Sequence, residues 1–255
     1  MLKIQPKTFF VGKNLVFLPS CHSTNDIASE IIQNKEFIDG TVIIADHQTA
    51  GKGQRGNRWE SQPTENLLMS IILKTSFLPI DQQFDLSITV GISVLEALNT
   101  FPVPNLSIKW PNDLYLGEKK IGGILIENSI LGTKINTSVV GIGINIHQQN
   151  FENPRASSLE KEINHLNFDR SKIAEKICER LESNLYLLQK NGRESIREKY
   201  HQNLFGKGQT RLFKTEDGIL EGIILGITEN GQLRLSTQGS EKYYNIKEIE
   251  YLFNE

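Results

Sequence analysis

The stretch Gly51-Lys52-Gly53-Gln54-Arg55-Gly56-Asn57-Arg58-Trp59 holds three glycines and three cationic side chains within nine residues, and the rest of the sequence is organised around it. It follows an apolar run, residues 41–45, that predicts a strand. Glycine lets the backbone adopt positive φ and approach a ligand closely, and successive N–H groups in such turns form anion-binding concavities. The stretch therefore indicates an anion-binding loop, with a solvated basic surface loop as the alternative.

The spacing of the three glycines also matches the dinucleotide-binding fingerprint, which requires a helix to begin at the third glycine. Residues 57–63 have no helical apolar period, and Pro63 interrupts them. The further motifs of protein kinases, a strand with a Val-Ala-Ile-Lys pattern and a His-Arg-Asp loop, do not follow. The sequence thus excludes a Rossmann fold and a kinase fold around this loop.

Outward from the loop, apolar periodicity predicts a sheet with helices packed on it. Ser23 or Thr24 is expected to N-cap a first helix, and Asp169 to N-cap a long one that stops near Gly192. The predicted helices cover residues 84–99, 170–190 and 194–203, and the predicted strands cover residues 9–11, 15–18, 41–46, 67–74, 106–110, 114–116, 121–127 and 137–146.

After Gly206-Lys207-Gly208 the pattern changes to short alternating strands. Asn230-Gly231 predicts a type I′ hairpin turn. We expect a small antiparallel barrel here, and hence two domains, 1–205 and 206–255. The strands of the second domain are predicted at residues 210–213, 220–228, 232–237 and 243–246.

Composition narrows the class of protein. The 255 residues are 38% hydrophobic and carry a net charge of −2, which is ordinary for a globular protein and offers no general basic field for nucleic acid. The two cysteines, Cys21 and Cys178, favour the reducing cytoplasm over a disulfide scaffold. No signal peptide, membrane span or zinc-ligand spacing is present in the sequence.

A second cluster of polar residues, Lys109-Trp110-Pro111-Asn112-Asp113, follows a predicted strand. The hairpin after it is expected to return Lys120 to the same end of the sheet. Asp113 is a candidate Mg²⁺ ligand that would share the ion with substrate phosphates. The adjacent Gly122-Gly123 indicates close approach by a ligand or by backbone, although each lysine alone is more often simply solvated.

A third cluster is Gly141-Ile142-Gly143-Ile144-Asn145. Alternation along a strand places the isoleucines on the core face and the glycines and Asn145 on the other, which becomes flat and nearly bare. This face suits a planar ligand or, equally, close packing of a helix. Together the three clusters favour nucleotidyl transfer onto a small acid, with developing charge stabilised by fixed cations.

Five segments occur in the order seen in biotin protein ligases, and the sequence resembles that family over about residues 20–160. The resemblance implies an α+β fold like the catalytic domain of class II aminoacyl-tRNA synthetases, with a mixed, largely antiparallel sheet, and a small SH3-like C-terminal barrel. The segments are Ser23-Thr24-Asn25, Gln48 to Gly56, Lys109 to Leu114, Lys120 to Glu127 and Gly141 to Asn145.

The resemblance implies an ATP-dependent ligase. Biotin would attack the α-phosphate of ATP, with Mg²⁺ present, to give biotinyl-5′-AMP, and a lysine of a biotin carboxyl carrier protein domain would then take the biotin. The implied catalytic residues are Lys120, Lys52 and Arg55, and Asp113 is the implied Mg²⁺ ligand. The implied biotin-binding residues are Ser23, Thr24, Asn25, Gln48, Lys52, Gly53, Gln54, Lys120, Gly122 and Gly123, and the implied ATP-binding residues are Gly51, Arg55, Trp59, Lys109, Asn112 and Asn145.

The sequence also departs from the family. Gln54 stands where many members carry an arginine, so that either Gln54 or the neighbouring Arg55 retains the adenylate. Only 22 residues precede Ser23, fewer than the ~50 of a small domain, so we expect no DNA-binding domain and no DNA partner. The alternatives are a lipoate or octanoate ligase or transferase of the same fold and a non-catalytic nucleotide- or RNA-binding protein, and a homodimer stays open.

Overall fold

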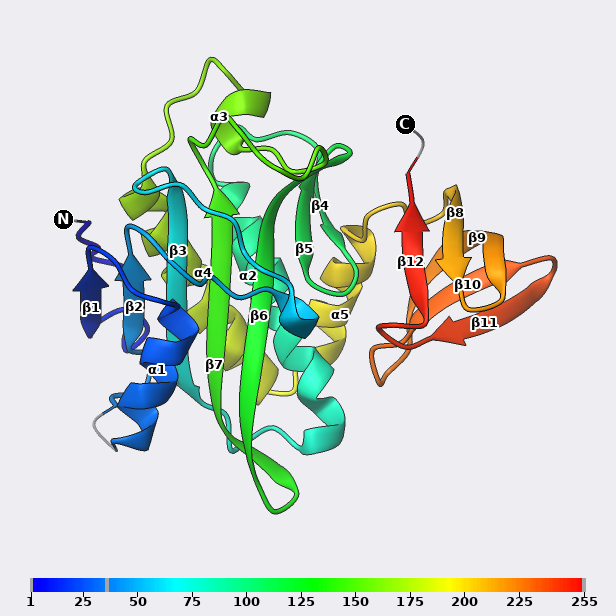
Figure 1. Ribbon diagram of the computed structural model, residues 1–255. Helices are drawn as coiled ribbons and strands as arrows, with labels where there is room; N and C mark the ends of the chain where they lie inside the picture. Colours follow the sequence, from blue (N-terminus) through cyan, green and yellow to red (C-terminus); the bar gives the residue numbers. More distant parts are fainter. Residues whose placement is uncertain (1, 35–36, 254–255) are drawn as a thin grey trace.

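The computed structural model describes residues 2–34 and 37–253, except for the side chain of Arg55. It contains a seven-stranded sheet and a five-stranded sheet lying side by side (Figure 1). The larger sheet has the order β1-β2-β3-β7-β6-β5-β4, and every pair is antiparallel except β1 with β2. Its strands are Leu15–Leu18 (β1), Val42–Ala45 (β2), Asn66–Lys74 (β3), Leu106–Lys109 (β4), Asp113–Leu116 (β5), Lys119–Leu131 (β6) and Lys134–Asn145 (β7).

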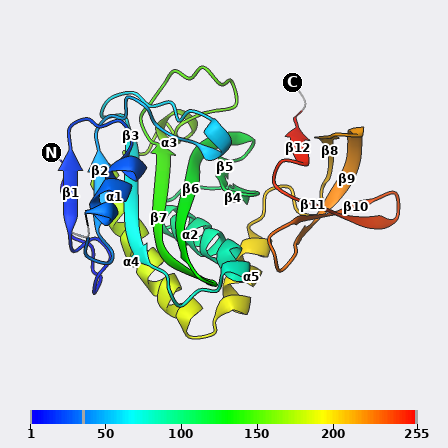
Figure 2. The same cartoon turned by 60° about the horizontal axis from the view of Figure 1, so that its bottom comes forward.

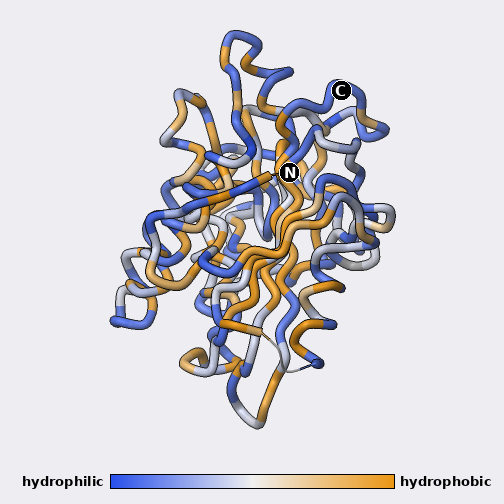
Figure 3. Tube along the Cα trace, turned by 90° about the vertical axis from the view of Figure 1, so that its left-hand side faces the viewer, coloured by the Kyte–Doolittle hydropathy of each residue, from blue (hydrophilic) through white to orange (hydrophobic). Residues whose placement is uncertain are grey.

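Helices cover both faces of the larger sheet, α1 on one and α2 with α4 on the other (Figures 1 and 2). Side chains alternate accordingly: Ile43 packs in a small cluster under α1, whereas Val42 and Ile44 belong to the main core. Several strands of the sheet contain long hydrophobic stretches (Figure 3), and residues 66–73 of β3 are all buried. The helices are Thr24–Gln33 (α1), Gln83–Leu98 (α2), Leu159–Glu162 (α3), Arg170–Gln189 (α4) and Arg193–Gln202 (α5), with single 3₁₀ turns at Gln54–Gly56 (η1) and Ile80–Gln82 (η2).

The mixed sheet and the main helices agree with the sequence-based predictions. Asp169 caps α4 by accepting from the amides of Ser171 and Lys172. The predicted strand at 9–11 is wrong, because the amides of Phe9, Phe10 and Val11 donate to the carboxylate of Glu182 and hold this segment as a turn. None of the helices in the described residues is long and apolar enough to cross a membrane.

The stretch of residues 51–59, here called the glycine loop, contains the single turn η1 and then continues as extended backbone. It is not followed by a long helix, and the sheet around it is largely antiparallel, so the exclusion of a Rossmann fold is confirmed. Backbone hydrogen bonds fold the loop back on itself, from Gly53 N to Asn57 O (2.7 Å) and from Trp59 N to Gly51 O (2.9 Å).

The C-terminal sheet has the order β11-β10-β9-β8-β12. The SH3-like barrel is not confirmed, since in the described residues β11 pairs only with β10 and β12 only with β8, which leaves the sheet open. The sequence-based prediction also missed β12. The strands are Thr210–Thr215 (β8), Gly218–Ile227 (β9), Leu233–Thr237 (β10), Ser240–Tyr244 (β11) and Ile249–Leu252 (β12).

The turn between β9 and β10 docks the C-terminal sheet onto the larger one. Trp110 Nε1 donates to the carbonyl of Gly231 (2.9 Å), and Arg197 joins the carbonyl of Thr228 (3.1 Å) to the buried Asp85 (2.6 Å). Gly231 has φ of +83° whereas Asn230 does not have positive φ, so the predicted hairpin forms but its type I′ turn does not.

Gly231→Ala is expected to destabilise the protein by roughly 1–3 kcal/mol more than Gly239→Ala, the range for forcing extra atoms into a packed site. A Cβ at Gly231 would lie 2.2 Å from the ring of Phe84, whereas one at Gly239 would meet nothing within 4 Å. Both glycines have φ of +83°, so the free-energy cost of holding alanine at positive φ is the same in the two variants. Urea unfolding measures the difference, and equal losses of stability would contradict this docking contact.

Candidate active site

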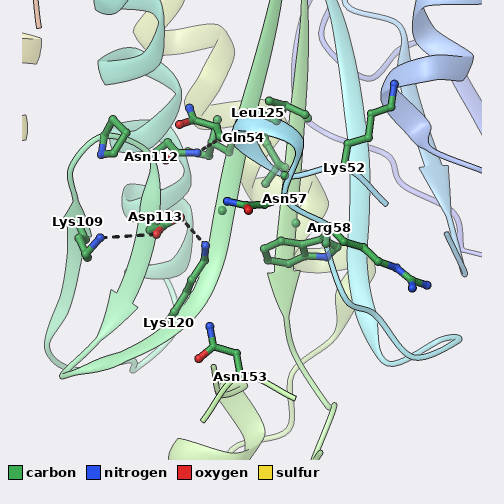
Figure 4. Close-up of a pocket in the computed structure, with 18 of the residues that line it drawn as sticks. Lys52, Gln54, Asn57, Arg58, Lys109, Asn112, Asp113, Lys120, Leu125 and Asn153 are labelled. Carbon is green, nitrogen blue, oxygen red and sulfur yellow. Dashed lines mark hydrogen bonds and ion pairs between the residues drawn. The ribbon is translucent and has the colours of Figure 1, made fainter. Parts of the chain in front are cut away.

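A cavity of about 450 Å³ lies where the glycine loop, the strands β5 to β7 and the C-terminal strand β12 meet (Figure 4). Its polar end, at the start of α1, is lined by the uncharged side chains of Ser23, Thr24, Asn25 and Gln48. Its cationic end, beside β12, is lined by Lys109, Lys120 and Arg155. It brings together most of the predicted site residues: Ser23, Thr24, Asn25, Gln48, Lys52, Gly53, Gln54, Trp59, Lys109, Asn112, Asp113, Lys120 and Gly123.

The polar end is a buried hydrogen-bond network. Gln48 Oε1 accepts from the amide of Thr24 (2.7 Å) and from its hydroxyl (3.0 Å), so Gln48 rather than Ser23 supplies the side-chain cap of α1. Ser70 Oγ lies 2.7 Å from Thr24 Oγ1 and 2.6 Å from Asn25 Oδ1. Asn25 Nδ2 donates to Glu127 (2.7 Å). These contacts fix the polar side chains before any ligand arrives.

Glycines form the floor of the cavity. Gly123 and Gly143 are paired in register, and a Cβ would lie 3.1 Å from the Trp59 indole at Gly123 and 2.6 Å from it at Gly143. A Cβ at Gly141 would lie 2.3 Å from Asn25 Oδ1. The bare face therefore packs against the Trp59 indole and lets α1 approach closely, which agrees with the helix-packing alternative, whereas binding of a planar ligand there stays a prediction.

Three predicted residues are placed differently from the expectation. Gly122 does not line the cavity, because alternation turns it away from Gly123, toward Leu114 Cδ1, which a Cβ would meet at 2.9 Å. Asn145 donates to the carbonyl of Ser157 (2.9 Å) and holds the segment after β7 instead of lining the cavity. Gly51 lines a neighbouring hollow, together with Thr49, Ala50 and Gly56, and does not line the cavity.

Lys52 and Arg58 of the glycine loop are directed away from the centre of the cavity (Figure 4). The Lys52 ammonium forms an ion pair with Asp26 of α1, and Arg58 donates to the carbonyl of Thr49 (3.4 Å). Gln54 lines the cavity, and the side chain of Arg55 lies outside the described residues, so the predicted role of Arg55 stays a prediction.

The cationic end is built by the β5–β6 hairpin. Lys120 Nζ lies 2.6 Å from Asp113 Oδ1, and Lys109 Nζ lies 4.0 Å from Asp113 Oδ2 (Figure 4). The register shifts between Leu114 and Tyr115, and such a bulge redirects side chains. The hairpin thus returns Lys120 to the same end of the sheet as Lys109, as predicted. Burial lowers the pKa of Lys109.

Sequence reasoning missed several lining residues. Arg155 comes from the segment after β7, and its carbonyl accepts from the amide of Lys120 (2.8 Å). Tyr251 and Phe253 come from β12 and the residues after it. Ser70 does not line the cavity but contacts Thr24 and Asn25, and it had one signal, since it is the single hydroxyl in the apolar run 67–73 of β3. Tyr251 and Phe253 gave none, because long-range packing brings them to the cavity.

The fold and this cavity are those of an enzyme class that joins small carboxylic acids to proteins. The model of the biotin/lipoate A/B protein ligase family matches residues 17–145, and the chain belongs to this family.

Individual relatives are similar over nearly the whole chain. The bifunctional ligase/repressor BirA of Bacillus spizizenii is 30% identical over 245 residues, which are 94% of this chain and 74% of that protein. The biotin–[acetyl-CoA-carboxylase] ligase of Mycobacterium tuberculosis is 28% identical, over 84% of this chain and 80% of that protein. The structure of the Aquifex aeolicus biotin protein ligase in complex with biotin and ATP superimposes with a TM-score of 0.78 at 30% identity, covering 95% of this chain and all (100%) of that one.

Proposed function

We propose that this chain is an ATP-dependent biotin protein ligase, which activates biotin as biotinyl-5′-AMP and transfers it to a lysine of a biotin carboxyl carrier protein domain. The observation that carries the proposal is the single cavity that joins an uncharged polar end to a cationic end. The names of its relatives, which include biotin ligases solved with biotin and ATP, support the same reaction.

The polar end suits the ureido ring of biotin. Amide and hydroxyl groups supply both donors and acceptors, and the ureido group needs both. Thr24, Asn25 and Gln48 are buried, yet they line the cavity. Because they are held by their neighbours and by Ser70, they lose little side-chain freedom when a ligand binds.

The first step takes place where the two ends meet. A biotin carboxylate oxygen attacks the α-phosphorus of ATP, and the bond to the β-phosphate oxygen breaks with its electron pair leaving on pyrophosphate. Lys120 lies between the Trp59 ring (5.9 Å) and Asp113, so its ammonium is placed to stabilise the negative charge on the phosphoryl oxygens.

Mg²⁺ fits this site as an ion held by one carboxylate and by substrate phosphates. No group of three or more His, Cys, Asp or Glu side chains that would hold a metal occurs in the described part of the chain. Asp113 is the carboxylate beside the two lysines, and Mg²⁺ is usually bound through one or two carboxylates together with phosphates. Bound there, the ion would neutralise charge on the phosphates.

The second step is attack by a neutral lysine amine of the carrier protein domain on the carbonyl carbon of the adenylate, which releases AMP. The glycine loop and Trp59 form the outer wall of the cavity and shield the reactive anhydride from water. In this proposal residues 1–205 are the catalytic domain, and residues 206–255 are a second domain that completes the cavity through β12.

ATP–pyrophosphate exchange tests the proposed function. The purified chain is expected to exchange labelled pyrophosphate into ATP only when biotin is present, because the first step is reversible and needs the acid. Lipoate and octanoate serve as controls, since they are the acids of the alternative function. Exchange driven by lipoate and not by biotin would favour the lipoate alternative, and the absence of exchange with any acid would contradict activation by adenylation.

A further inference from the structure

An aromatic cluster joins β12 to the cationic end of the cavity. Tyr115 of β5 lies 4.9 Å from Phe205 and 6.0 Å from Phe253 between ring centroids. Tyr251 of β12 packs on Phe213 (5.0 Å), Phe205 (6.2 Å) and Phe253 (6.5 Å). The rings therefore belong to both sheets and to the segment that connects them.

Two cations of the cavity rest on these rings. Lys109 Nζ lies 4.4 Å from the centroid of Tyr251 and 5.8 Å from that of Tyr115. The guanidinium of Arg155 lies 4.3 Å from the centroid of Phe253. Both cations line the cavity, so the aromatic cluster determines where two of its positive charges are held.

Few carboxylates oppose the charges of these two cations. Within the described residues Arg155 forms no ion pair, and Lys109 has one carboxylate within 4.0 Å, Asp113, which lies closer to Lys120. A carboxylate in place of the aromatic ring would cancel the positive charge of the lysine or arginine and would repel a phosphate. An aromatic face attracts a cation by about 0.5–2 kcal/mol without adding a negative charge.

We propose that Tyr251 and Phe253 are positioning residues, which hold Lys109 and Arg155 as a pair of cations for the phosphates that leave ATP as pyrophosphate. Lys120 lies beside the Trp59 ring on the glycine floor, whereas Lys109 and Arg155 rest against the C-terminal sheet. The α-phosphate then meets the biotin carboxylate near Lys120, and the two terminal phosphates extend toward the rings of Tyr251 and Phe253. This inference rests on the proposed function, because it assigns a place to the leaving group of that reaction.

The test is a set of variants in biotin-dependent ATP–pyrophosphate exchange. Tyr251→Leu removes the ring and is expected to raise the KM for pyrophosphate by about tenfold, from the loss of one buried cation–π contact. Tyr251→Phe keeps the ring and is expected to leave this KM unchanged within about twofold. The KM for biotin is the internal control, since the polar end of the cavity does not contact Tyr251.

Other results would overturn the inference. In one such result, the wild-type chain exchanges with biotin while Tyr251→Leu has the same KM for pyrophosphate as the wild type. This result would show that the Tyr251 ring does not position Lys109. An equal rise in the KM for biotin would show a merely structural role. If the wild-type chain shows no exchange, the proposed function itself fails, which is a separate result.

Phe253→Leu and Arg155→Gln give a second test that is independent of the folding of Tyr251→Leu. Each variant is expected to raise the KM for pyrophosphate, and the double variant to raise it no further than Arg155→Gln alone, because Phe253 acts through Arg155. Multiplicative effects of the two substitutions on this KM would overturn the inference.

Discussion

Lys120→Ala is expected to lower the rate of biotinyl-5′-AMP formation by about 100- to 1000-fold, the range measured when one fixed donor to a developing negative charge is removed. Lys120 lies 2.6 Å from Asp113 and faces the Trp59 ring, at the point where the two ends of the cavity meet. The variant also removes the nearest counter-ion of the Asp113 carboxylate, which then repels the incoming phosphates more strongly. Quench-flow measurement of adenylate in a single turnover checks the result.

Lys119→Ala is the matched control. Lys119 is the adjacent residue in β6, but it is exposed, does not line the cavity, and donates to the carbonyl of Pro154 (3.0 Å). We expect its adenylate yield to stay within about twofold of the wild type, as for most surface substitutions. An undiminished single-turnover yield from Lys120→Ala would remove Lys120 from the catalytic step.

Gly141→Ala is expected to raise the KM for biotin by about 10- to 100-fold, because displacing a buried, hydrogen-bonded group costs roughly 1–3 kcal/mol. A Cβ at this position would lie 2.3 Å from Asn25 Oδ1. Asn25 has little space to move, since Ser70 and Glu127 hold its two amide atoms at 2.6 and 2.7 Å. The substitution acts on the polar end of the cavity, so the KM for ATP is expected to change much less.

Gly91→Ala provides the comparison. Gly91 lies in α2, outside the cavity lining, and a Cβ there would meet the terminal methyl of Ile108 at 3.3 Å. A small shift of that methyl group relieves the contact, so both KM values are expected to stay near those of the wild type. A KM for biotin that is equally unaffected in Gly141→Ala would mean that Asn25 does not contact biotin.

Local patterns predicted the parts of the site that lie within one strand or hairpin. Alternation placed Ile142 and Ile144 in the core and left Gly143 bare, and the hairpin predicted the return of Lys120. The same alternation explains why Gly122 does not line the cavity, since its side of β6 faces Leu114.

The rest depends on contacts between distant segments. Arg155 and Tyr251 reach the cavity only because the segment after β7 and the strand β12 pack beside β5 and β6. Hydropathy alone does not predict such packing, and β12 itself was missed. The closed barrel was inferred from the succession of short strands, but strand pairing decides closure, and β11 and β12 stay at opposite edges of the C-terminal sheet.

Transfer of oxygen from biotin to AMP tests activation through biotinyl-5′-AMP most directly. The chain is incubated with ATP, a biotin carboxyl carrier protein domain and biotin labelled with ¹⁸O in both carboxylate positions, and AMP and the carrier are analysed by mass spectrometry. Attack on the α-phosphate followed by transfer to lysine predicts one ¹⁸O in AMP and one in the new amide. Unlabelled AMP beside a biotinylated carrier, or a carrier without biotin, would contradict activation through biotinyl-5′-AMP and transfer by this chain.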